Sequence, residues 1–149
     1  MIELEEIRKT DFYLYRMPTL FAENKANKCF AKISNGIISY QLAWQSDLLK
    51  PIVLNIKQEI YCIGIDQYFC VIDFTRINIL LNLKLMYNFY DVKIFQDWIF
   101  VICELEIIKI NKDNLNIEDE FGLPDFFEKM DFENNLIKIK CLNNNYITL

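Results

Sequence analysis

The stretch Gln-Asp-Trp-Ile-Phe-Val-Ile-Cys at residues 96–103 contains a polar pair followed by six apolar residues. A two-residue polar pair between apolar runs is typical of a β-hairpin turn, and β-branched and aromatic residues favour strands. The same arrangement recurs at residues 58–65 and 134–141, which lie 38 residues before and after it. This recurrence predicts a repeat made of short antiparallel strands.

A second polar break recurs at the same offset and gives each repeat four short strands joined by tight turns. The three units are residues 29–66, 67–104 and 105–142, and their second break falls at Asn35, Asp73 and Asn111. We therefore predict one all-β repeat domain over residues 1–149.

The pattern continues past both ends of these three units. Residues Asp11 to Arg16 and Thr19 to Glu23 are expected to be the last two strands of an incomplete earlier unit. Tyr146 to Leu149 takes the place of the strand that begins a further unit. Because edge strands expose unpaired backbone groups, a terminal strand that pairs with the other end of the chain would close a ring.

Residues 96–103 and 134–141 resemble the inner-strand entry of a β-propeller blade. Residues 106–117 continue as such blades do, with a strand, a polar turn and another strand. The pattern is similar to quinoprotein-type and WD-repeat propellers over most of residues 12–149, although Gly64 alone supplies the glycine usual after the first strand. The resemblance implies a small or incomplete β-propeller-like fold, with a β-sandwich or barrel as the alternative. It implies no particular function, because propellers host many.

Composition excludes several classes of function. The 149 residues are 53% apolar, which is enough to bury a core. The net charge of −5 opposes general nucleic-acid binding, which requires a basic face. The chain has no His, the commonest general base and metal ligand, and its three glycines form no phosphate-binding loop. We therefore expect a protein that is not an enzyme and that holds no cofactor or metal.

The cysteines and the N-terminal residues predict a cytoplasmic protein. Five cysteines without a CxxC pair lie among apolar residues, as expected of reduced core side chains. Glu3, Glu5 and Glu6 interrupt the pattern of a secretory signal. The longest apolar run, 98–103, is far shorter than the ~20 residues of a membrane helix.

The most distinctive charged segment is 113–133, which contains eight carboxylates and a single lysine, Lys129. A well-solvated turn and strand rim would account for this charge. Alternatively, the segment is a docking surface for a basic protein. Its negative charge would then speed association, and its aromatic side chains would supply apolar contact area. A calcium loop is not expected, because its alternating ligand spacing is missing. The predicted partner-binding residues are Asp113, Glu118, Asp119, Glu120, Phe121, Asp125, Phe126 and Glu128.

In size, charge and composition the chain resembles bacterial immunity proteins, which neutralise the toxic domains of antibacterial toxins, often basic nucleases. The resemblance implies an inhibitor that binds a basic protein toxin. From the charge and the short apolar runs we expect no contact with nucleic acid or membrane, and we expect a monomer or a dimer. Two alternatives stay open. One is a self-assembling scaffold that uses open strand edges. The other is a carboxylate-dependent hydrolase that uses Asp66, Asp73 or Glu104, which lie at the ends of expected strands.

Overall fold

The structure is a computed structural model that describes residues 1–22 and 27–149. In it the three polar pairs form two-residue hairpin turns, as the sequence predicts. The first residue of each pair has a positive φ, 47° at Gln58, 54° at Gln96 and 49° at Asn134, as tight hairpin turns require. The turns join β4 (Ile52–Lys57) to β5 (Ile60–Ile65), β8 (Phe89–Phe95) to β9 (Trp98–Cys103), and β12 (Phe127–Glu133) to β13 (Leu136–Cys141).

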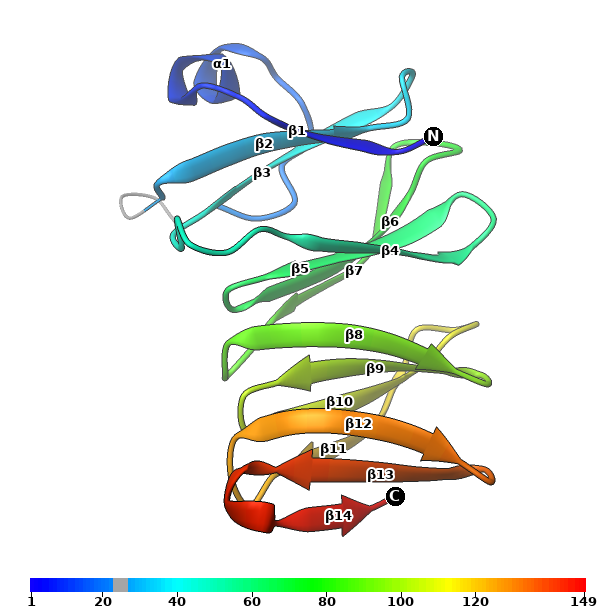
Figure 1. Cartoon of the computed structure of the whole chain (residues 1–149). Helices are drawn as coiled ribbons and strands as arrows, with labels where there is room; N and C mark the ends of the chain where they lie inside the picture. Colours follow the sequence, from blue (N-terminus) through cyan, green and yellow to red (C-terminus); the bar gives the residue numbers. More distant parts are fainter. Residues whose placement is uncertain (23–26) are drawn as a thin grey trace. The chain divides into compact units, whose positions relative to one another are not determined.

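The chain forms two compact units, Met1–Lys84 and Leu85–Leu149. In the first unit, sheet A has the order β1-β2-β3, and sheet B has the order β4-β5-β6-β7 (Figure 1). Residues 18–21 add to sheet A beside β3, because Gln41 N–H donates to Pro18 O at 2.9 Å and Leu20 N–H donates to Gln41 O at 2.8 Å. The other strands of this unit are β1 (Glu3–Glu6), β2 (Cys29–Ser34), β3 (Ser39–Trp44), β6 (Tyr68–Asp73) and β7 (Asn78–Lys84).

Sheets A and B of the first unit pack face to face through alternate residues of their strands. Ile33 and Leu42 of sheet A and Ile63 and Ile72 of sheet B belong to one core, and each is fully buried. Complete burial of such a side chain contributes about 1.5–3 kcal/mol. The core between the sheets therefore holds this unit together.

The second unit repeats this arrangement with sheet C, in the order β11-β10-β9-β8, and sheet D, in the order β12-β13-β14. Phe100 and Ile107 of sheet C share a core with Ile139 of sheet D. Phe95 also stacks on Phe132, with ring centroids 4.4 Å apart. The other elements of this unit are β10 (Glu106–Asn111), β11 (Ile117–Gly122), a 3-10 turn (Leu142–Asn144) and β14 (Tyr146–Thr148).

The prediction of an all-β fold is confirmed, and the described residues form four antiparallel sheets, none of them closed into a barrel. The strands keep the 38-residue offset, since β5, β9 and β13 begin at Ile60, Trp98 and Leu136. The boundaries of the sheets differ from those of the predicted units. Sheet B begins inside the unit 29–66 and ends inside the unit 67–104.

The prediction of a strand over Asp11–Arg16 is wrong, because Lys9–Leu14 forms the helix α1. Phe12 of α1 is buried against Phe30 and Ala43 of sheet A, and this contact fixes the helix there. A six-residue helix is too short to show a helical period in the sequence. The strand β1, in turn, has four exposed residues and therefore no apolar alternation by which it could be predicted.

The other two terminal predictions have mixed outcomes. Residues 18–21 do lie beside β3, but Thr19 pairs with Gln41 through a single parallel bridge rather than as a regular antiparallel strand. Glu23 lies outside the described residues. The strand predicted over Tyr146–Leu149 is present as β14, which forms the third strand of sheet D beside β13.

Candidate functional site

Four of the predicted partner-binding residues gather on and beside β11, which is an edge strand of sheet C. Glu118, Asp119 and Glu120 are exposed on β11, and Asp113 is exposed in the turn before it. We call these four residues the acidic edge. Asn111 Oδ1 shapes the turn by accepting hydrogen bonds from the backbone N–H of Asp113 at 2.8 Å and of Asn114 at 3.1 Å.

The other four predicted residues have different surroundings. Phe121 is half-buried and packs against the core between sheets C and D. Asp125 accepts hydrogen bonds from Phe126 N–H at 2.8 Å and from Asn143 Nδ2 at 2.7 Å, so it orders the loop before β12. Phe126 is 48% exposed. Glu128 is exposed on β12 and lies 3.4 Å from Lys140 Nζ. Of this group, Phe126 is the aromatic side chain best placed to meet a partner.

The carboxylates of β12 are balanced by lysines, two of which come from the neighbouring strand β13. Antiparallel strands bring side chains that are distant in sequence onto one face, where opposite charges pair. Such exposed pairs add little stability, but they reduce the negative charge of this part of the segment. The three pairs are Glu128–Lys140 at 3.4 Å, Asp131–Lys129 at 3.3 Å and Glu133–Lys138 at 3.2 Å.

The three carboxylates on β11, Glu118, Asp119 and Glu120, keep their charge. Among the described residues, no lysine or arginine nitrogen lies within 4.0 Å of a carboxylate oxygen of Glu118, Asp119 or Glu120. Lys109 is the register partner of Asp119, but its ammonium lies over the Trp98 ring, 4.0 Å from the centroid. Burial, together with repulsion from Glu120, raises the pKa of Glu106 on β10. The negative field therefore extends from the exposed strand onto its neighbour.

The three carboxylates considered for a hydrolase each support a turn or loop. Asp66 Oδ2 accepts hydrogen bonds from the backbone N–H of Gln45 at 2.8 Å and of Ser46 at 3.1 Å. Hydrogen bonds from Thr75 N–H and Oγ1 hold the pKa of Asp73 below its ordinary value. In the second unit, Glu104 Oε1 accepts a hydrogen bond from Asn88 Nδ2 at 3.3 Å. Each carboxylate thus has a structural role.

The cysteines are free thiols in the structure, and four of the five are buried. Burial raises the pKa of Cys62, Cys70 and Cys103 to about 12, so they remain protonated near neutral pH. Burial is also the main cause of the raised pKa of the half-buried Cys29. The prediction of small core side chains is therefore confirmed for the four buried residues.

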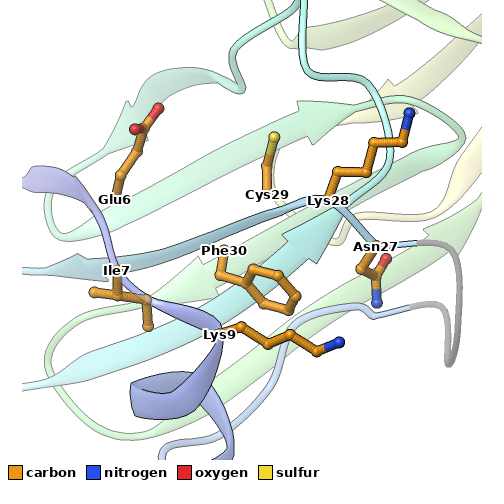
Figure 2. Close-up of a pocket in the computed structure, with 7 residues that line it drawn as sticks. All are labelled: Glu6, Ile7, Lys9, Asn27, Lys28, Cys29 and Phe30. Carbon is orange, nitrogen blue, oxygen red and sulfur yellow. The ribbon is translucent and has the colours of Figure 1, made fainter.

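Cys29 lines a hollow of about 350 Å³ at one end of β2, together with Glu6, Lys9 and Lys28. Figure 2 shows Cys29 and Phe30 pointing to opposite sides of β2, with Glu6 on the side of Cys29 and Lys9 on the side of Phe30. The charged groups therefore do not converge on a common point. We do not consider this hollow a candidate site.

A larger cavity, of about 490 Å³, lies elsewhere in the first unit, between sheet A and the segment that follows α1. Its lining includes Glu5, Lys32 and Ser39, one from each strand of sheet A. None of these residues was predicted as functional. To predict this cavity from the sequence, β1 would have to be predicted first, because its pairing with β2 places Glu5 beside Lys32.

Comparison of the sequence with protein-family models and with curated proteins finds no match. Across residues 1–22 and 27–149, no helix is long and apolar enough to cross a membrane. Over the same residues, no three His, Cys, Asp or Glu side chains gather as a metal site would require. The acidic edge is therefore the candidate functional site.

Proposed function

We propose that this protein is a non-enzymatic binding module that engages a basic protein through the acidic edge. The observation that carries the proposal is the contrast between two neighbouring segments. The carboxylates of β12 each have a lysine within 3.4 Å, whereas Glu118, Asp119 and Glu120 on β11 have no such partner among the described residues. A basic surface is the complement of such an edge.

Two features of β11 suit this role. Clustered charges of one sign raise association rates with an oppositely charged partner by about 10–1000-fold. An edge strand also has backbone groups along its outer side that another chain can contact. Ile117 and Phe126, which are 44% and 48% exposed, offer apolar area close in sequence to the charged residues.

The more specific form of the proposal is an inhibitor of the immunity type, which neutralises a basic protein toxin such as a nuclease in the cytoplasm. The chain's small size and its net charge of −5 support this form, and the five free thiols suit a reducing compartment. We further propose that the sheets are blades of a small or incomplete β-propeller-like array. The 38-residue spacing of β5, β9 and β13 supports this architecture.

A self-assembling structural module is the second candidate, favoured by β14 at the edge of sheet D. This strand contains Tyr146, Ile147 and Thr148, with none of the charges that discourage edge-to-edge pairing. Sedimentation of the purified protein tests it. A defined dimer or larger assembly without any partner would favour this candidate, and a monomer would remove it.

The binding proposal is tested by affinity capture from the source cell's lysate, with identification of the retained proteins by mass spectrometry. The bait variant carries Glu118→Lys, Asp119→Lys and Glu120→Lys. Its matched control carries Glu128→Lys, Asp131→Lys and Glu133→Lys, which change the net charge equally at sites that already have lysine partners.

We expect one basic protein to be captured by the wild type and the control and lost with the acidic-edge variant. The captured protein is then purified, and its complex with the wild type should be one-to-one and weakened by salt. Equal capture by the acidic-edge variant would contradict the proposal, as would equal loss with both variants. Circular dichroism establishes beforehand that each variant is folded.

A further inference from the structure

The turn that joins β2 to β3 begins with an Asn-Gly pair, Asn35-Gly36, and neither of the other two glycines follows an asparagine. A backbone nitrogen attacks the amide carbon of a preceding asparagine most readily when it belongs to glycine, which has no side chain to obstruct the approach. Gly36 is exposed, and among the described residues only its chain neighbours lie within 4 Å of the place that a Cβ would occupy. The turn therefore has no steric protection against deamidation.

Hydrogen bonds hold the side-chain amide of Asn35 in place. Its Oδ1 accepts from the backbone N–H of Ile37 at 2.9 Å and of Ile38 at 2.7 Å. Its Nδ2 donates to Phe74 O at 3.1 Å. Deamidation removes Nδ2 from the side chain, so the bond to Phe74 has to break during the reaction. The bonds to Oδ1 restrict rotation of the amide in the closed turn.

The backbone nitrogen that would attack is held as well. Gly36 N–H donates to Ser34 Oγ at 3.0 Å, and Ser34 Oγ also accepts from Ser39 Oγ at 2.8 Å. The nitrogen has to lose its proton in the reaction, and a serine hydroxyl is not basic enough to take it. Local opening of the turn, which frees both the amide and the nitrogen, is therefore the route to reaction.

The same amide links the two sheets of the first unit. Phe74 lies in the turn between β6 and β7, so the bond from Asn35 Nδ2 joins the β2–β3 turn of sheet A to sheet B. A carboxylate in place of the amide has no hydrogen to donate, and its oxygens repel the carbonyl oxygen of Phe74. Deamidation therefore removes the donor of this link.

We infer that Asn35 is a site of spontaneous deamidation whose rate is controlled by the fold. In the opened turn, the Gly36 nitrogen bonds to Asn35 Cγ, the Cγ–Nδ2 bond breaks, and Nδ2 leaves as ammonia with the proton of the attacking nitrogen. Water then opens the cyclic imide at one of its two carbonyl carbons, which gives aspartate or isoaspartate. The net reaction consumes one water, releases one ammonia and adds one negative charge to the chain.

Mass spectrometry of proteolytic peptides tests the inference, with the purified protein incubated at pH 8 with and without urea. Asn35 should deamidate at least about tenfold more slowly in the folded protein than in urea, because several hydrogen bonds hold the closed turn. Tyr40→Phe removes a neighbouring bond to the β6–β7 turn, so it should speed the reaction of the folded protein about 2–10-fold and leave the rate in urea unchanged. Tyr13→Phe, at an exposed position of the same unit, should change neither rate.

Equal rates with and without urea would overturn the inference, as would the absence of modification at residue 35 in urea. A faster reaction in the folded protein would also overturn it, because the hydrogen bonds to Oδ1 would then activate the amide carbon. Equal effects of Tyr40→Phe and Tyr13→Phe would contradict control by the link between the sheets. The capture experiment at the acidic edge has no bearing on these rates, so the inference stands or fails separately from the proposed function.

Discussion

Replacement of Tyr40 by Phe should destabilise the first unit by removing a single hydroxyl. Tyr40 on β3 is fully buried, and its hydroxyl donates to Asp73 O at 2.6 Å and accepts from Asn78 N–H at 2.9 Å. These bonds tie sheet A to the β6–β7 turn of sheet B. A buried hydrogen bond contributes about 0.5–1.5 kcal/mol, and stranding its partner costs about 1–3 kcal/mol.

For two bonds we therefore expect a loss of about 2–4 kcal/mol in the free energy of unfolding, measured by urea titration. At about 2–4 °C per kcal/mol for a chain of this size, Tm should fall by roughly 4–16 °C. Tyr13→Phe is the matched control, because Tyr13 is 60% exposed in the same unit. A loss below about 1 kcal/mol, or an equal loss in the control, would refute the reasoning.

The same substitution has a pH signature. Burial is the main cause that raises the pKa of Tyr40 above its ordinary value of 10.0. The folded state therefore holds the phenol proton more tightly than the unfolded state does, so the stability from Tyr40 is complete below pH 10 and declines above it. The difference between wild type and Tyr40→Phe should narrow as the pH rises from 9 to 11.5. A constant difference would show that the pKa of Tyr40 is the same in the folded and unfolded states, and it would contradict the prediction.

Two further predictions concern the other titrating groups. Glu120→Gln should lower the pKa of Glu106, followed by carbon-13 NMR of the side-chain carboxyl, because it removes the repulsion. A raised carboxyl pKa means that stability falls as Glu106 ionises, so this variant should be more stable than wild type at pH 7 by up to about 1 kcal/mol, and an unchanged Glu106 titration would contradict it. Cys62, Cys70 and Cys103, with pKa values of about 12, should resist a thiol-specific disulfide reagent at pH 8 until urea unfolds the chain. Their rapid modification in the folded protein would contradict the burial argument.

The features predictable from sequence are those with local causes. Polar pairs such as Gln96-Asp97 and Asn134-Asn135 mark their own turns, because two residues between apolar runs suffice to reverse a strand. The helix α1 was missed because its determinant is distant: Phe12 is helical where it packs on Phe30.

The same distinction explains the candidate site. Glu118, Asp119 and Glu120 were identified because the charge of the segment is visible in sequence. The lysines that balance β12 were missed, because Lys138 and Lys140 reach it only across the β12–β13 pairing. The cavity beside α1 was missed for a similar reason, since Glu5 and Lys32 come together only when β1 pairs with β2.

The pairing of β1 with β2 also has a consequence for the order of folding. Hairpins with two-residue turns form in about 1–10 μs, whereas a strand that must first close a long loop pays a larger entropic cost. β1 ends at Glu6 and β2 begins at Cys29, so Glu5 reaches Lys32 only after that loop has closed. We expect the edge of sheet A to be the last part of the first unit to assemble and the first to open. Amide hydrogen exchange should then be faster in β1 than in β5 or β6.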